Sequence, residues 1–277
     1  MSHTLPYEVN CSIIFTELPV LERPAAARAA GFGAVEFWWP FGQAVPSDRE
    51  ADAFVAAVRD AGVQLAGLNF FGGDMASGDR GLASWPGRSA EFRDNIDATV
   101  GIGERLGCAA FNALYGNRID GVPAGEQDDL ATENLALAAQ GAARIGGTVL
   151  IEPVSAVPRY PLRTAADALE VIGRVRSASG AENIGLLADL YHLAVNGDDV
   201  GKVIAEHTGQ VAHVQIADSP GRHEPGTGDL PLETQLADLQ ARGYDGWVGL
   251  EYNPSAASDD SFGWLPRERR AAVRRAS

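Results

Sequence analysis

Four apolar runs in the second half of the chain each end on a side chain that carries oxygen. These side chains are Glu152, Asp189, Gln215 and Glu251. Burying three carboxylates together is costly unless a positive charge neutralises them. Carboxylate and amide oxygens are hard ligands, which suit Mg²⁺ or Mn²⁺ better than Zn²⁺. The spacing therefore predicts a divalent-metal site, and the alternative is that each acid is solvated or paired separately.

Two histidines and one further acid lie beside these residues. His192 follows Asp189 by three residues, where the chain should turn into a loop, so it would lie beside the metal and contact the substrate, or be an ordinary loop histidine. His213 shares a face of its strand with Gln215 but lies deeper, which favours a hydrogen-bonded core histidine over a metal ligand. Asp218 follows the same strand.

The segment SPGRHEPGTGDL, residues 219–230, carries charge among two prolines and three glycines. Such a rigid loop would display Arg222 and His223 over the site, where we expect both to bind substrate. Arginine suits a carboxylate, which it can grip with two parallel hydrogen bonds. The following acidic stretch NPSAASDD disfavours a phosphorylated sugar. The alternative is a solvated surface loop.

Aromatic residues gather at the ends of the other apolar runs. They either fill the core or form an apolar wall that excludes water from a small site. The residues concerned are Phe15, Phe37, Trp38, Trp39, Phe70, Phe71 and Tyr115.

The elements that must position these residues alternate between strand-like and helix-like patterns. Eight strand–helix units indicate a (β/α)8 TIM barrel, an α/β fold, in one domain over residues 1–277. No GxGxxG motif follows the first strand, which disfavours a dinucleotide-binding fold. The predicted strands are 8–15, 34–39, 64–70, 109–115, 148–153, 183–189, 211–217 and 247–252. The predicted helices are 21–30, 48–61, 88–106, 126–145, 164–177, 198–207 and 233–241, with a further one over 261–276.

The composition excludes several kinds of protein. A net charge of −15 opposes binding to nucleic acid and to anionic membranes. Lys202 is the single lysine, and it lies in a predicted surface helix, so Schiff-base and pyridoxal-phosphate chemistry are disfavoured. Two cysteines, no long apolar run and no signal-like start predict a cytoplasmic protein. Homo-oligomerisation is compatible with the sequence, which does not indicate an oligomeric state.

The stretches IEPV, LLADLYH, HVQIADSPGRHEPGTGD and GYDGWVGLEYNP together resemble the hydroxypyruvate isomerase family of xylose-isomerase-like barrels. The resemblance implies metal ligands at Glu152, Asp189, Gln215 and Glu251. It implies that Glu152 and Glu251 are also the catalytic acid–base pair, and that His192 and Arg222 contact the substrate. The wider superfamily usually has histidine where this chain has Gln215, which implies a loosely held Mg²⁺ or Mn²⁺.

The implied reaction interconverts hydroxypyruvate, a small hydroxy-keto acid, and tartronate semialdehyde by proton transfer through a metal-stabilised enediolate. The resemblance leaves open a 2-oxo-tetronate isomerase or a ketose 3-epimerase. An endonuclease IV-like repair enzyme would need more histidine ligands and a basic surface. A barrel that only binds a metabolite would not need both glutamates.

Overall fold

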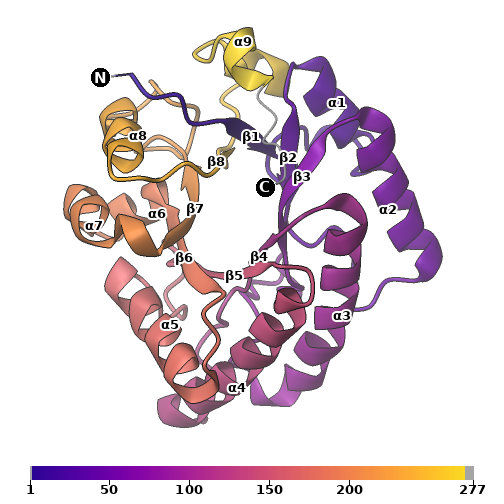
Figure 1. Cartoon of the computed structure of the whole chain (residues 1–277), viewed down its shortest axis with the longest axis vertical. Coiled ribbons are helices and arrows are strands. Elements are labelled where there is room, and N and C mark those ends of the chain that lie inside the picture. Colours follow the sequence, from indigo (N-terminus) through magenta and orange to yellow (C-terminus); the bar gives the residue numbers. More distant parts are fainter. Residues whose placement is uncertain (1, 272–277) are drawn as a thin grey trace.

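Eight parallel strands close into a barrel in the computed structural model, which describes residues 2–271 (Figure 1). Each strand pairs with the next, and β8 pairs with β1, so the barrel has no open edge. The predicted (β/α)8 fold is confirmed. The strands are β1 (Tyr7–Asn10), β2 (Ala34–Phe37), β3 (Gln64–Asn69), β4 (Ala110–Asn112), β5 (Thr148–Ile151), β6 (Ile184–Asp189), β7 (Val211–Ile216) and β8 (Val248–Leu250).

The helices form a ring around the strands (Figure 1). They are α1 (Arg23–Ala29), α2 (Asp48–Ala61), α3 (Ser89–Leu106), α4 (Ala124–Ala143), α5 (Ala165–Ser179), α6 (Leu190–Val195), α7 (Val200–His207), α8 (Leu232–Ala241) and α9 (Arg267–Arg270). Three short 3₁₀ helices are η1 (Pro86–Arg88), η2 (Thr208–Gln210) and η3 (Ser258–Phe262).

Two helices differ from the prediction. Helix α6 begins directly after β6, where a loop was expected, because the Asp189 side chain caps its first turn. Of the predicted helix over 261–276, only α9 and the end of η3 are helical within the described residues, and positions 272–276 lie outside them.

Local signals set the ends of the well-predicted helices. Ser47 caps α2 in a capping box with Glu50, and Gly62 ends α2 in the left-handed conformation that glycine adopts readily. Thr164 and Asp167 form the same box at α5. These interactions satisfy backbone groups that a helix end leaves without partners.

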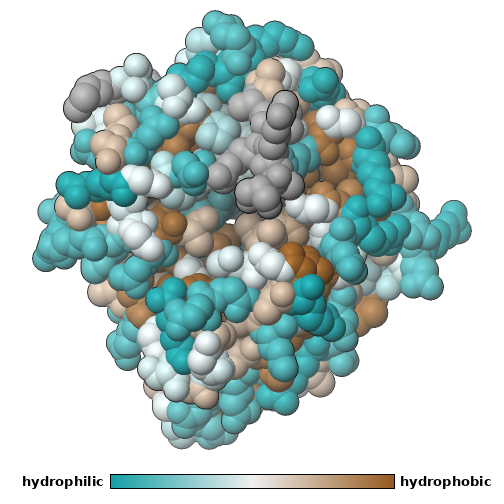
Figure 2. All heavy atoms as spheres, viewed as in Figure 1, coloured by the Kyte–Doolittle hydropathy of each residue, from teal (hydrophilic) through white to brown (hydrophobic). Residues whose placement is uncertain are grey.

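Apolar side chains fill the space between the strands and the helices. Every residue of β6 is buried, as expected for a parallel strand covered on both faces. Hydrophilic residues dominate the face of the molecule shown in Figure 2, and apolar residues lie mostly between the helices and toward the centre. Within residues 2–271, no helix combines the length and apolar character needed to cross a membrane.

Candidate active site

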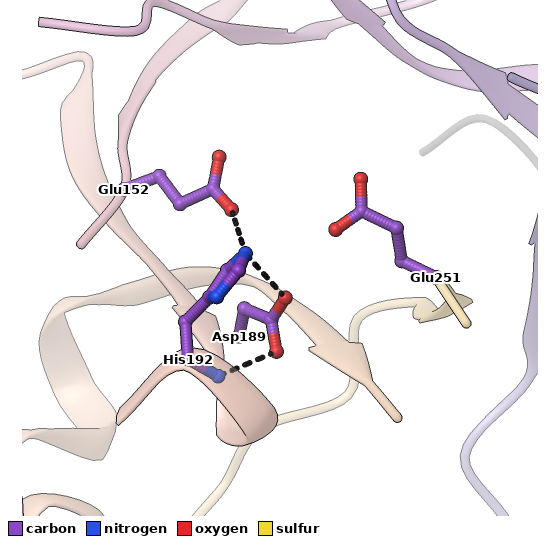
Figure 3. A group of neighbouring side chains, drawn as sticks. All are labelled: Glu152, Asp189, His192 and Glu251. Carbon is purple, nitrogen blue, oxygen red and sulfur yellow. Dashed lines mark hydrogen bonds and ion pairs between the residues drawn. The ribbon is translucent and has the colours of Figure 1, made fainter. Parts of the chain in front are cut away.

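The four predicted metal ligands lie at the carboxyl ends of four consecutive strands. Glu152 follows β5, Asp189 ends β6, Gln215 lies near the end of β7, and Glu251 follows β8. All four side chains are buried. Atoms of Glu152, Asp189, His192 and Glu251 lie within 4.8 Å of one another (Figure 3). This is the end of the barrel where TIM-barrel enzymes carry their active sites.

Asp189 serves both the fold and the site. Its Oδ1 accepts hydrogen bonds from the backbone N–H groups of Tyr191 and His192 at 2.8 and 3.2 Å, which starts helix α6. Its Oδ2 is buried and has no hydrogen-bond partner within the described chain. Burial raises the pKa of Asp189, and the charge of Arg222 opposes this rise.

His192 points its ring into the cluster from α6 (Figure 3). The backbone N–H of Ser155 donates to Nδ1 at 3.2 Å, so Nδ1 is an acceptor and the proton of the neutral ring lies on Nε2. That nitrogen lies 3.5 Å from Asp189 Oδ2 and 3.9 Å from Glu152 Oε1. Burial, with the nearby Arg222 charge, lowers the pKa of His192 to about 3, so the ring is a neutral donor.

Few groups near Glu152 stabilise a negative charge on its carboxyl group. Its Oε2 accepts one hydrogen bond, from Asn112 Nδ2 at 2.7 Å. Burial and the charges of Glu251 and Asp189 raise the pKa of Glu152 well above its ordinary value. A carboxyl group in this environment favours the protonated form unless a cation neutralises the charges around it.

Glu251 receives three hydrogen-bond donors. Its Oε1 accepts from Trp38 Nε1 at 2.7 Å and from Asn10 Nδ2 at 3.1 Å, and its Oε2 accepts from Arg222 Nη2 at 2.7 Å. Burial raises the pKa of Glu251 to about 7, although the Arg222 charge opposes the rise. The two glutamates thus have different environments, and Glu251 receives more hydrogen-bond donors than Glu152.

Gln215 supplies the amide oxygen of the predicted ligand set. Its Nε2 donates to Glu36 Oε1 at 2.8 Å, while its Oε1 is buried and has no hydrogen-bond partner within the described residues. Buried acceptors normally have hydrogen-bond partners, so Gln215 Oε1 and Asp189 Oδ2, which have none within the described residues, could hold a cation. Carboxylate and amide oxygens are the ligands of Mg²⁺ and Mn²⁺.

The loop after β7 brings Arg222 to the site and holds His223 away from it. Arg222 lies over the Tyr191 ring at 5.5 Å and within 3.9 Å of Asp189 Oδ2. Its backbone has φ of 56°, a conformation that costs free energy in a non-glycine residue. His223 Nδ1 lies 2.7 Å from the carbonyl oxygen of Asn253, outside the cluster of carboxylates.

Asp218 and His213 have structural environments. Asp218 accepts from the backbone N–H groups of Ser219, Gly226 and Leu230, and so folds the loop that carries Arg222. His213 lies inside the barrel, with Nε2 2.9 Å from Glu36 Oε2. The expectation of a hydrogen-bonded core histidine agrees with this contact.

The aromatic residues divide between core and cavity. Phe15, Phe37 and Tyr115 are almost fully buried in the hydrophobic core. Phe70 and Phe71 are also buried in the core, and together with Trp38 and Trp39 they line a cavity of about 680 Å³. Because Trp38 also donates to Glu251, this cavity borders the site.

Several site contacts escaped the sequence analysis. Asn10, Trp38 and Asn112 donate directly to the two glutamates, and Glu36 accepts from Gln215. These residues belong to the first half of the barrel: Asn10, Glu36 and Asn112 lie in β1, β2 and β4, and Trp38 follows β2. In that half, Glu36, within FGAVEFWW, is the one acid near the end of a strand. The signal that could have found them is a polar residue within an apolar strand.

Comparison with known proteins identifies the fold and the family. The family model described as "Xylose isomerase-like TIM barrel" matches residues 24–268. The chain belongs to this family. A solved structure titled AP endonuclease, family 2, from Brucella melitensis superposes with a TM-score of 0.85, at 34% identity, and the match covers 94% of this chain and 98% of that one.

Curated relatives of this xylose isomerase-like barrel are named as isomerases. A Streptomyces coelicolor protein named "Putative hydroxypyruvate isomerase" is 54% identical over 96% of this chain and 97% of its own length. A Cupriavidus necator protein named "2-oxo-tetronate isomerase" is 36% identical over 94% of this chain and 96% of its own. The expected resemblance and the expected enzyme class, an isomerase, are confirmed.

Proposed function

We propose that the enzyme interconverts hydroxypyruvate and tartronate semialdehyde. The observation that supports this most directly is the pair of buried glutamates, Glu152 and Glu251, which face one another across the end of the barrel (Figure 3). Moving a carbonyl group along a hydroxy-keto acid requires a base and an acid close to adjacent carbon atoms. The relative at 54% identity carries the name of this activity.

The chemistry consists of removal of a proton from one carbon atom and delivery of a proton to the neighbouring one. A base removes a proton from the hydroxymethyl carbon, which gives an enediolate, and a proton is then delivered to the neighbouring carbon. The remaining hydroxyl proton moves between the two oxygens. We propose Glu251 as the base, since its three donors favour the ionised form, and Glu152 as its partner, which holds or returns the proton.

The proposed metal site consists of Glu152, Asp189, Gln215 and Glu251. A bound Mg²⁺ or Mn²⁺ would stabilise the negative charge that develops on two adjacent substrate oxygens. The free oxygens of Asp189 and Gln215 support this site. Metal ligation by both glutamates would also favour their ionised forms.

Binding of the acid substrate is assigned to the residues around this cluster. Arg222 would hold the substrate carboxylate, and its position beside Glu251 would bring the reacting carbon to the base. His192, a neutral donor with Nε2–H directed into the cluster, would hydrogen-bond a substrate oxygen. A role of His223 in substrate binding remains a prediction from the sequence.

The test is turnover of hydroxypyruvate coupled to a tartronate semialdehyde reductase, after metal removal with EDTA and again with Mg²⁺ or Mn²⁺ added. We expect activity to vanish with the chelator and to return with the metal. Activity that survives complete metal removal would contradict the metal site and leave the isomerase. No activity under any condition would contradict the proposed substrate.

The second candidate is the same proton transfer on a 2-oxo-tetronate. The aromatic cavity of about 680 Å³ is lined by Trp38, which donates to Glu251, and this favours room for a longer acid; a relative at 36% identity carries that name. A comparison of kcat/KM for the two acids decides between them, because both require the same glutamates. Turnover of neither acid would direct the search to free ketoses, the substrates of a 3-epimerase.

A further inference from the structure

A second cluster of polar residues lies deeper in the barrel, below the candidate active site. Glu8, Glu36 and His213 are buried there, and the ring nitrogen Nε2 of His213 lies 3.3 Å from Glu8 and 2.9 Å from Glu36. The proposed reaction uses none of these residues. Buried carboxylates cost free energy, so their contacts indicate what they do.

Glu36 connects this cluster to the site. Its Oε1 accepts from Gln215 Nε2 at 2.8 Å and from Asn10 Nδ2 at 3.0 Å. Asn10 Nδ2 also lies 3.1 Å from Glu251 Oε1, and Asn10 Oδ1 accepts from the backbone of Ser12. One carboxylate on β2 therefore contacts a residue of β1 and a residue of β7 that both reach the site.

The barrel is built to let Glu36 reach β7. Strands β1 and β8 separate β2 from β7, and Gly249 of β8 is paired in register with Gln215. A Cβ atom on Gly249 would lie 2.7 Å from Glu36 Oε1. On the other side, Gly67 of β3 is paired with Glu36, and a Cβ atom there would lie 3.1 Å from Oε2. Two glycines thus provide the space that the Glu36 carboxylate occupies.

A glutamine ligand, unlike a carboxylate, binds a cation in only one of the two orientations of its terminal group. Its amide has an oxygen end and a nitrogen end, and only the oxygen can bind a cation. Glu36 Oε1 accepts from both Asn10 and Gln215, so it presents an acceptor to the amide. Glu36 therefore selects the nitrogen end of Gln215 for itself and leaves the oxygen end free and buried.

We propose that Glu36 is a positioning residue, which orients the Gln215 amide so that its oxygen faces the cation. This inference rests on the proposed metal site. It goes beyond that site because it gives a role to a buried acid outside the ligand set. It also explains how a glutamine could serve as the β7 ligand, since Glu36 fixes the orientation of the amide, which has two different ends.

The experiment measures Mn²⁺ binding to the metal-free protein, by the electron paramagnetic resonance signal of free Mn²⁺. Glu36→Gln offers Gln215 both a donor and an acceptor, so the selection is lost and we expect binding to weaken about 10–100-fold. Glu8→Gln is the matched control, the same change in the same buried cluster, where Glu8 contacts His213 and Glu36. Because its effect must pass through Glu36, we expect the control to weaken Mn²⁺ binding less than Glu36→Gln does.

A double-mutant cycle with Gln215→Glu separates orientation from packing and charge. Both terminal atoms of a carboxylate are oxygens, so in this background the cation no longer depends on amide orientation. We expect Glu36→Gln to leave Mn²⁺ binding unchanged or tighter there, because it also removes the contact between two carboxylates. An equal loss in both backgrounds would overturn the proposal.

Two further measurements keep the outcomes distinct. Gly67→Ala displaces Glu36 without changing any polar group, because the added Cβ would lie 3.1 Å from Glu36 Oε2 and its nearest contacts are all atoms of Glu36, and we expect it to weaken Mn²⁺ binding as Glu36→Gln does. Circular dichroism of each variant checks that the barrel is folded. Wild-type affinity in Glu36→Gln would refute the positioning role alone. Absence of Mn²⁺ binding by the wild type would instead refute the proposed metal site, and the positioning role with it.

Discussion

At the scale of single residues, the two glutamates of the site differ in how many donors they receive. Glu251 accepts from Trp38, Asn10 and Arg222, whereas Asn112 donates to Glu152. Donors stabilise the ionised form of a carboxyl group. This difference is the reason for proposing Glu251 as the base and Glu152 as its partner, and it makes the two replacements distinguishable.

Replacing either glutamate should lower kcat by about 10²–10⁴-fold, the usual contribution of an acid or base. The two variants should differ in isotope exchange. With hydroxypyruvate deuterated at the hydroxymethyl carbon, Glu152→Gln should still release deuterium to water, because Glu251 remains to remove it. Glu251→Gln should not. The opposite pattern, read by NMR, would exchange the two roles.

Arg222→Ala should mainly raise KM, by about tenfold or more, because the substrate carboxylate loses a charged hydrogen-bond partner. A smaller fall in kcat is expected as well, since Arg222 also donates to Glu251. Steady-state kinetics measure both constants. A fall in kcat as large as the rise in KM would contradict a main role in holding the carboxylate.

At the scale of elements, the loop after β7 depends on one buried acid. Asp218 accepts from the backbone N–H groups of Ser219, Gly226 and Leu230. Burial raises the pKa of Asp218, but these hydrogen bonds lower it further, so the net pKa lies below the ordinary value. The loop that presents Arg222 is therefore most stable when Asp218 is ionised.

Asp218→Asn should lower the free energy of unfolding by about 1–3 kcal/mol at neutral pH, because an amide cannot accept at both ends. The folded pKa is below the unfolded one, so the stabilisation is complete above the unfolded pKa and is lost as the pH falls through the folded pKa. The difference in Tm between wild type and variant should therefore shrink below about pH 3.9. Asp229→Asn, an exposed residue of the same loop, is the control. A difference that does not depend on pH would contradict this role of Asp218.

The strands and most helices could be predicted because their signals are local. Apolar runs, the caps at Ser47 and Thr164, and the terminal Gly62 all act over a few residues. The predicted strands extended too far at their carboxyl ends, for example to 15 where β1 ends at Asn10. There the chain leaves the sheet while remaining buried, so hydrophobicity does not mark the boundary.

The placement of Glu152, Asp189, Gln215 and Glu251 at one end of the barrel could be predicted because each lies at the end of a strand, but their supporting contacts could not. Trp38 donates to Glu251, and Gln215 donates to Glu36. Both contacts form because the sheet closes on itself and brings β2 near β7 and β8. Those pairs are separated by 213 and 179 positions in the sequence. No periodicity within a strand encodes such a distance.

At the scale of the whole molecule, the site concentrates negative charge inside an acidic protein. Three carboxylates are buried together in a chain of net charge −15. A cation that binds the folded chain and not the unfolded one stabilises the fold. The barrel should therefore resist heat better when the metal is bound.

Addition of Mn²⁺ at about 100 times its Kd should stabilise the fold by about 2.7 kcal/mol. For a chain of this size, that corresponds to a rise in Tm of roughly 5 °C. Asp189→Asn should abolish this rise, because it removes a carboxylate ligand. Calorimetry at a series of Mn²⁺ concentrations makes the measurement, and a Tm that does not depend on Mn²⁺ in the wild type would contradict the prediction.

The two oxygens of Asp189 give the site a built-in reporter. One oxygen holds the backbone amides of Tyr191 and His192 at the start of α6, and the other faces the proposed cation. A cation that draws electron density from this carboxylate weakens it as an acceptor for those amides. Hydrogen–deuterium exchange at these two backbone positions should therefore follow occupancy of the site, with no label attached to the protein and no substrate present.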